Sequence, residues 1–457
     1  MKQPAFFQSV IRIAIPVALQ SMLQSSFSMI DQVMVGQLGS TSIAAVGIAG
    51  KFAFLYSVVI GAVTAIAGIM IAQYMGQKDQ RAGDRSLCVN LMAAGASGIV
   101  FTLLSVLLPT QIMRLYSDDA DAVRLAADYL RIVAGTYLPM GGASALSVML
   151  RCSDRARAPL VAAVVSALMN TGLNYLLIFG KLGAPMLGVQ GAAIASAVSQ
   201  WVNALVVALF FRRFLSKRWE RFCPSIKMSG TERRQYLVML LPVMVNEFLW
   251  GLGQNVYTVI YSHIGTQEVA AVALISPVES LLIGALSGFA QAAGILIGKR
   301  LGEEAYHEAY GESKRLMKYG FVGSALLSLL LLLLKRPYVR IYQVEDYVLH
   351  TAEWLLAAFA VLAPFKVQNM ILGGGIIRSG GKTKYIMGID LMGTWLIGIP
   401  LGFLCARVLQ LPVAWVYFVI GLEEIVRWIV SVWLFRSRKW MVKIDAGEGD
   451  DKGARII

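Results

Sequence analysis

Two stretches that repeat each other decide the fold: GQLGSTSIAAV at 36–46 and SHIGTQEVAAV at 262–272. They align at an offset of 226 positions, and the same offset carries Pro16 onto Pro242. The match runs without a gap from Pro16 to Gly76. Both copies are apolar, so the chain is predicted to consist of two homologous membrane halves, a common plan for transporters.

The composition also indicates a membrane protein. Hydrophobic residues make up 57% of the chain and charged residues 15%, whereas a soluble protein has about 25% charged residues. Apolar runs near the roughly 20 residues that span a bilayer recur along the chain. They predict twelve spans, at 10–36, 44–75, 86–113, 122–149, 158–180, 187–211, 236–263, 269–298, 314–334, 346–377, 385–406 and 412–435.

The net charge of +14 is spread over alternate connections between the spans. These connections contain Lys78/Arg81/Arg85, Arg151/Arg155/Arg157, a run from Arg212 to Arg234, Lys299/Arg300, Arg378/Lys382/Lys384 and Arg436/Arg438/Lys439. This positive-inside pattern predicts a multi-pass protein of the cell (plasma) membrane with both termini in the cytoplasm. It argues against nucleic-acid binding, which needs the basic residues on one surface.

The fold class expected is an all-α integral membrane protein with two six-helix bundles. Each half has an even number of spans, so both start from the same side and a pseudo-twofold axis runs along the membrane normal. We expect an N-terminal lobe at 1–213, a basic cytoplasmic linker at 214–235, a C-terminal lobe at 236–440 and a disordered cytoplasmic tail at 441–457. The linker either lies on the anionic inner leaflet or is solvated.

Asp31 lies well inside the first span, where an ionised side chain costs about 2.5–3.5 kcal/mol. Asn170 and Asn174 are four residues apart and share one helix face. With Ser196, they supply oxygen ligands of the kind a hard cation prefers beside a carboxylate. Asp31 is therefore predicted to bind a coupling cation, either Na⁺ or a proton. A buried Asp satisfied by neighbouring amides is the alternative.

Several motifs resemble the multidrug and toxic compound extrusion (MATE) family, and the resemblance covers roughly 10–440. They are Ile15–Pro16, Met29–Asp31 followed by Gly36, Leu38–Gly39, Asn170 with Asn174, Gly188–Ala193 and Arg378–Thr383.

The resemblance implies a two-lobed, twelve-helix antiporter that exports organic, mostly cationic compounds in exchange for Na⁺ or H⁺. It also places the family's N-lobe acid at Asp31. Many members carry a second acid where this chain has Asn174, and an amide cannot titrate, so Asp31 is expected to act as a single acid.

The second half has different polar residues, since Tyr257 occupies the repeat position of Asp31. Glu247, Trp250 and Gln254 follow one helix face, and an acid beside an aromatic ring suits an organic cation. In other branches of the family the acid comes about a turn later, so Glu247 is assigned by analogy. A buried Glu bonded to a neighbouring helix is the alternative.

Two further charged residues lie within predicted spans. Lys366 and Asp390 could pair with each other or act in gating. Glu423 and Arg427 are four apart in the last span, where a structural salt bridge is expected. Pro16 removes a backbone hydrogen bond from the first helix and is expected to let that helix bend.

Three functions compete. A cation-coupled exporter of small molecules is favoured over a flippase for a lipid-linked oligosaccharide, because the charges at membrane depth lean acidic and a diphosphate needs Arg or Lys. An embedded enzyme would need a cluster of nucleophile, His and acid, and the three His stand apart from the buried acids. We expect no cofactor beyond the coupling ion, membrane lipids and small-molecule substrates as partners, and a monomer.

Overall fold

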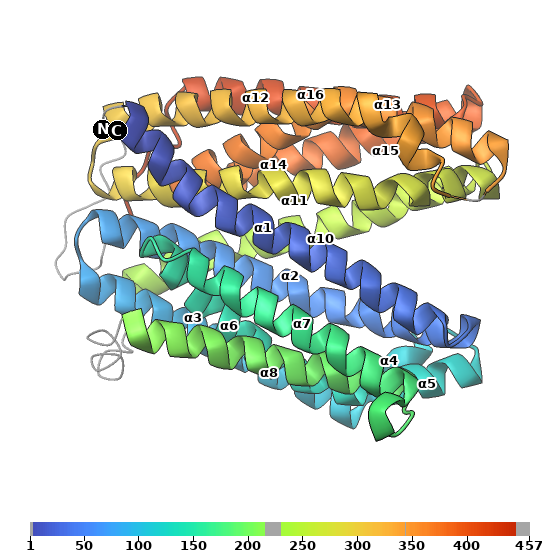
Figure 1. The fold of residues 1–457 in the computed structure, drawn as a ribbon. Coiled ribbons are helices and arrows are strands. Elements are labelled where there is room, and N and C mark those ends of the chain that lie inside the picture. The colour runs from blue at the N-terminus through green and yellow to red at the C-terminus, as the bar shows by residue number, and fades with distance from the viewer. Residues whose placement is uncertain (1–2, 215–229, 343, 445–457) are drawn as a thin grey trace.

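Helices account for almost all of the chain in the computed structural model, which describes residues 3–214, 230–342 and 344–444. The described residues contain no strand. Figure 1 shows two lobes of roughly aligned helices, which converge at the end where α1 begins and diverge toward the other end.

The N-terminal lobe is built from α1 to α8. Its helices are α1 (Gln3–Gly36), α2 (Ser40–Gly76), α3 (Gln80–Leu107), α4 (Pro109–Arg114), α5 (Ala120–Val133), α6 (Tyr137–Cys152), α7 (Arg157–Phe179) and α8 (Val189–Phe214). Local signals set several ends. Asp79 caps α3 by accepting from the Ala82 amide at 2.9 Å, and Gly180 ends α7 in the left-handed region at φ 64°.

The C-terminal lobe repeats this order. Its helices are α10 (Gly230–Ser262), α11 (Thr266–Gly302), α12 (Tyr306–Val339), α13 (Asp346–Asn369), α14 (Thr383–Leu391), α15 (Ile399–Phe403) and α16 (Val413–Arg436), with π-helical segments at η3 (Met370–Ile377), η4 (Met392–Gly398) and η5 (Leu404–Val408).

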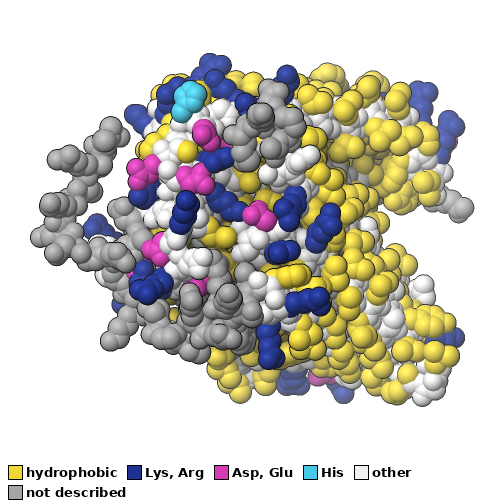
Figure 2. All heavy atoms as spheres, turned by 60° about the vertical axis from the view of Figure 1, so that its left-hand side comes forward, with side chains coloured by type: hydrophobic (Ala, Val, Ile, Leu, Met, Phe, Trp, Pro, Cys, Tyr) yellow, Lys and Arg dark blue, Asp and Glu magenta, His cyan; other side chains and the backbone are white. Residues whose placement is uncertain are grey.

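Eleven helical segments among the described residues are long and apolar enough to cross a membrane. The twelfth, α16, has 24 residues, but every 18-residue stretch of it contains Glu423, Glu424 and Arg427. Hydrophobic side chains are exposed on the outer helices, for example Leu107 at 69% and Leu333 at 69%. Figure 2 shows this apolar surface along the flank and charged side chains gathered at the end where the lobes converge. The chain is a twelve-helix membrane protein.

The internal repeat is visible in the helices themselves. α2 and α11 both have 37 residues, begin 226 positions apart, and follow a glycine, Gly39 or Gly265. The turn after each helix has a residue with positive φ at the same repeat position, Lys78 at 60° and Glu304 at 58°. The sequence offset therefore reflects two copies of one helical unit.

The lobes contact each other closely where the ends of α2 and α11 cross. A Cβ at Gly76 would clash with the Lys299 carbonyl oxygen, and a Cβ at Gly302 would clash with the Gln73 carbonyl oxygen. Gln73 and Lys299 occupy the same repeat position, so the two close contacts are related by the pseudo-twofold. Only glycine permits this backbone approach.

In each half, the first part of the first helix packs against the other half. Phe7 in α1 packs on Tyr319 of the C-terminal lobe, with ring centroids 5.2 Å apart. The later part of α1 contacts α7 of its own lobe. α10 mirrors this, since Tyr236 donates to Asn90 of the N-terminal lobe at 3.1 Å. Pro16 lies between the two parts of α1, which continues through it as one helix.

Two expected boundaries are wrong. The linker does not extend to residue 235, because Gly230 already begins α10; 215–229 lie outside the described residues. The tail is not disordered from 441, because Ile444 is only 5% exposed and its amide donates to Gln73 Oε1 at 2.7 Å. The rest of that expected tail, 445–457, also lies outside the described residues.

Candidate functional site

Asp31 lies against the two asparagines that the sequence singled out. The Asn174 amide nitrogen donates to Asp31 Oδ1 at 2.6 Å and to Asn170 Oδ1 at 3.2 Å. Asn174 is 1% exposed and Asn170 8% exposed. The spacing of four residues on α7 turns both amides toward α1, as predicted.

Ser196 completes this group, and Ser199 joins it. The Asn170 amide nitrogen lies 3.4 Å from the hydroxyl oxygens of both serines on α8. If the Asn170 amide is turned over, its nitrogen donates to the two Asp31 carboxylate oxygens at 2.8 and 3.1 Å.

The oxygen atoms here suit a small cation as cargo. The Asn174 Oδ1 is buried and has no hydrogen-bond partner among the described residues. The Asp31 carboxylate, the amide oxygens of Asn170 and Asn174 and the serine hydroxyls are oxygen donors of the kind that a hard cation prefers. No group of three or more His, Cys, Asp or Glu that could hold a metal occurs in the described part of the chain, so a transition-metal centre finds no support there.

The C-terminal lobe has a denser ionic network. Asp390 pairs with Arg427 and accepts from the Asn246 amide at 2.8 Å. Arg427 also lies 3.8 Å from Glu423, as expected, and 3.5 Å from Glu424. Of the two alternatives left open for Asp390 and Lys366, mutual pairing is not found, because the Asp390 carboxylate is occupied by a guanidinium from α16, which offers more donors than an ammonium.

Tyr257 shows how the repeat diverged. It stands at the repeat position of Asp31, and its hydroxyl donates to Glu423 at 2.6 Å. The first lobe thus places an acid on its first helix, while the second lobe places the acid on its last helix. The two polar centres have different chemistry, as the sequence predicted.

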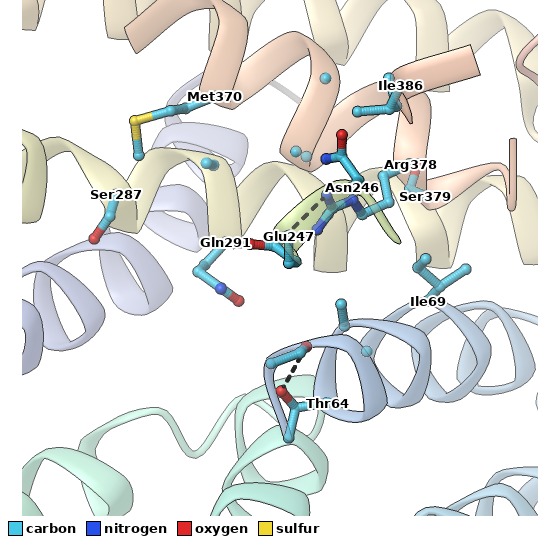
Figure 3. Close-up of a pocket in the computed structure, with 18 of the residues that line it drawn as sticks. Thr64, Ile69, Asn246, Glu247, Ser287, Gln291, Met370, Arg378, Ser379 and Ile386 are labelled. Carbon is cyan, nitrogen blue, oxygen red and sulfur yellow. Dashed lines mark hydrogen bonds and ion pairs between the residues drawn. The ribbon is translucent and has the colours of Figure 1, made fainter. Parts of the chain in front are cut away.

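A cavity of about 690 Å³ lies between the lobes. Glu247, Trp250, Lys366 and Asp390 line it, and Gln254 does not. Figure 3 shows the ion pair between Glu247 and Arg378 on the cavity wall formed by the C-terminal lobe, and Thr64 of α2 on the opposite wall. The ion-pair distance is 3.6 Å. The volume suits a drug-sized molecule.

The cavity is not acidic, which corrects the charge argument made from the sequence. Among the described residues, four basic and three acidic side chains line it: Arg151, Lys366, Arg378 and Arg427, and Glu247, Asp390 and Glu424. The two arginines at repeat positions, Arg151 and Arg378, were counted as cytoplasmic turn residues. Asp31, which was counted among the central acids, does not line the cavity.

The cavity is closed at the convergent end by residues that the sequence did not reveal. Gln73 of α2 is fully buried and donates to the Ser379 carbonyl at 2.7 Å and the Val442 carbonyl at 3.0 Å. The segment after α16 continues past this point, and Gln77 donates to the Ile444 carbonyl at 2.8 Å. These bonds join the N-terminal lobe to the C-terminal lobe. The only signal was a glutamine within an apolar helix.

Comparison with known proteins identifies the family. A family model, MatE, matches residues 16–176 and 242–404, which include both copies of the repeat. The chain belongs to the MATE family. It is therefore a multi-pass membrane transport protein.

Relatives of this MATE chain are bacterial. It is 23% identical over 440 residues to the probable multidrug resistance protein NorM of Thermotoga maritima, covering 96% of this chain and 94% of that one. It is 26% identical to the NorM of Pasteurella multocida, covering 96% and 95%, and 25% identical to the multidrug resistance protein MdtK of Edwardsiella ictaluri, covering 95% and 97%. Their names describe multidrug resistance proteins, which at the level of the family supports transport and not enzyme activity.

Solved structures share the fold. A MATE in the straight conformation matches with a TM-score of 0.86 and 19% identity, covering 94% of this MATE chain and 95% of that one. A MATE in the bent conformation matches with a TM-score of 0.83 and 19% identity, covering 95% of each chain. A transporter of the MOP superfamily from Pyrococcus furiosus, described as having a binding pocket of reverse polarity, matches with a TM-score of 0.84 and 19% identity, covering 94% and 95%.

Proposed function

We propose that this protein is a secondary antiporter that exports amphipathic organic drugs or metabolites across the plasma membrane. Import of Na⁺ or a proton at Asp31 drives the export by alternating access. The observation that carries the proposal is that Asp31, within the first membrane-spanning helix, is held by Asn174 at 2.6 Å. An acid at that depth is costly without a role in ion movement.

The ion site and the substrate cavity are separate but share one helix. Gln20 lines the cavity and Asp31 lies eleven residues further along α1. At 1.5 Å per residue, the two positions are about 16 Å apart along the helix axis. A change at Asp31 therefore reaches the cavity through a movement of α1.

Neutralisation of Asp31 provides the driving event. A bound cation or proton removes the net charge of the carboxylate and competes with the Asn174 amide for its oxygen atoms. The hydrogen-bonded contact between α7 and the later part of α1 then changes, while the earlier part of α1 stays packed on α11. Pro16 lies between these two parts and provides a place for the helix to bend.

The conformation of the structure fits an outward-open state. The lobes are closed at the end with the basic connections, which the positive-inside pattern assigns to the cytoplasm together with both termini. In the transport cycle, the substrate is then released to the outside before the contacts around Gln73 open. Two lobes related by a pseudo-twofold can exchange such states within one chain, so the proposed transporter acts as a monomer embedded in membrane lipid.

The cavity suits molecules with charge of either sign, because acidic and basic side chains line it together. Trp250 offers an aromatic face beside Glu247 for an organic cation. The alternative of a lipid-linked oligosaccharide flippase gains support from the four basic side chains, since phosphate recognition uses Arg and Lys. Vesicles loaded with a fluorescent lipid diphosphate distinguish the two functions, because an antiporter of small molecules leaves that lipid in its leaflet.

The main test is the variant Asp31→Asn in cells that lack other efflux pumps. We expect it to abolish efflux of a fluorescent amphipathic drug that the wild type exports, with normal expression in the membrane. The control is Asp128→Asn, which changes a partly exposed acid paired with Arg131 at 3.3 Å. Varying sodium and pH independently identifies the ion. Normal efflux by the Asp31 variant would contradict the proposal.

A further inference from the structure

Arg151 is a cavity-lining arginine that has no acidic partner among the described residues. It lies at the end of α6, and its Nη2 donates to the Gln20 amide oxygen at 2.9 Å. A guanidinium has five N–H donors, and the Arg151 guanidinium donates to a neutral amide, that of Gln20. No carboxylate of the described residues lies within ion-pair distance of it.

Comparison with the other half shows what is missing. Arg378, at the matching place in the repeat, pairs with Glu247 at 3.6 Å. The repeat position of Glu247 in the first half is Ser21, 226 residues earlier. The acid that neutralises one arginine is therefore absent for the other, although both line the same cavity.

Two more basic side chains line the cavity, Arg427 and Lys366, and they differ in their acidic partners. Arg427 is neutralised by three acids of its own lobe, Asp390, Glu423 and Glu424. Lys366, on the wall formed by α13, makes no ion pair within the described part of the chain, but the carboxylates of Glu279 and Glu423 attract it electrostatically. An unpaired buried charge is costly, so Arg151 is the basic side chain of the cavity that favours an incoming anion.

We propose that Arg151, with Gln20 beside it, binds the anionic group of the transported molecule. The substrate class is then an amphipathic acid or zwitterion with a carboxylate or a phosphate-type group, which a guanidinium binds through two parallel hydrogen bonds. The cavity of about 690 Å³ fits a small molecule of this kind. This inference deepens the proposed function, because it names the substrate class of the same cavity.

Three probes test the proposal by direct binding to the purified full-length protein in nanodiscs. They are an aromatic tertiary amine with a carboxylate, its methyl ester and its phosphonate analogue. We expect the wild type to bind the carboxylate or the phosphonate at least about tenfold more tightly than the ester, since a hydrogen bond to a charged group is worth that factor or more. The tighter of the two anions identifies the chemistry. Equal binding of all three would overturn the proposal.

Variants then assign the preference to one residue. Arg151→Gln should remove the preference for the anion and leave ester affinity within about twofold, while Arg151→Lys should retain part of it. Arg157→Gln is the matched control, because Arg157 is exposed and does not line the cavity. Equal loss of all three probes in Arg151→Gln, with normal binding in Arg151→Lys, would show a structural role and overturn the proposal.

Binding needs no ion gradient, so the experiment is independent of coupling at Asp31. An intact anion preference in a protein whose transport ignores Na⁺ and protons would refute the proposed coupling and leave this inference standing. If the protein shows no preference for the anionic probes but its transport is coupled to an ion, this inference is refuted and the proposed coupling stands. If Arg151→Gln does not fold, the comparison of the three probes in the wild type and in Arg151→Lys still decides.

Discussion

Gln73 provides a way to shift the protein between its two proposed states. Its side chain is fully buried on α2, and it makes three hydrogen bonds to the C-terminal lobe. The amide donates to the carbonyls of Ser379 at 2.7 Å and Val442 at 3.0 Å, and its oxygen accepts from the Ile444 amide at 2.7 Å. All three bonds join the lobes, so opening the cytoplasmic side breaks them.

The magnitude follows from these bonds. A typical hydrogen bond contributes a net of about 0.5–1.5 kcal/mol, so three contribute about 1.5–4.5 kcal/mol to the closed side. Gln73→Ala also leaves three backbone groups buried and unpaired in the outward-open state, whereas water reaches them once the lobes part. At about 1.4 kcal/mol per factor of ten, the ratio of the two states should shift at least roughly tenfold toward the inward-open form.

Spin labels measure this shift directly. Arg81 and His307 are exposed, occupy the same repeat position in the two lobes, and lie at the convergent end. With labels at these two sites and the native cysteines replaced, Gln73→Ala should populate longer distances than the wild type. The control is Gln368→Ala, which removes a buried amide that donates to the Met317 carbonyl at 2.8 Å within one lobe. If both variants keep the wild-type distance distribution, the Gln73 contacts do not hold the lobes together.

Two further predictions concern packing and charge. Gly302→Ala should force α2 and α11 apart, because its Cβ would clash with the Gln73 carbonyl oxygen, and should lower transport, whereas Gly311→Ala, in open space, should transport normally; equal transport rates would contradict the close crossing. Asp390→Asn should lower the free energy of unfolding by about 1.5–3 kcal/mol, because Arg427 loses a charged hydrogen-bond partner; an unchanged melting temperature in detergent would contradict that.

The two lobes and the Asp31 site could be predicted because both follow from regular spacings in the sequence. The offset of 226 residues fixed which helices correspond, and α2 and α11 indeed have the same length. Asn170 and Asn174 were expected to face one way because four residues make about one helical turn. Their contact with Asp31 then required only that α1 and α7 be neighbours within the N-terminal lobe.

The central cavity could not be predicted in the same way. The partner of Asp390 depends on how three helices are rotated relative to one another. The sequence analysis considered Lys366 for Asp390 and assigned Arg427 only to Glu423, four residues away on the same helix. The contacts of Ile444 depend on where the chain crosses the lobe interface after α16. Such long-range contacts leave no periodic signal, and the polar residues that follow Ile444 made the whole segment resemble a tail.

Ion-driven uptake into proteoliposomes tests the role of Asp31 most directly. The Asp31→Asn variant is reconstituted beside the wild type, and two reactions are compared: substrate accumulation driven by a Na⁺ or proton gradient, and exchange of labelled for unlabelled substrate without a gradient. We predict that the variant loses gradient-driven accumulation and retains exchange, because only the ion-binding step depends on the carboxylate. Gradient-driven accumulation at the wild-type rate would show that coupling does not pass through Asp31.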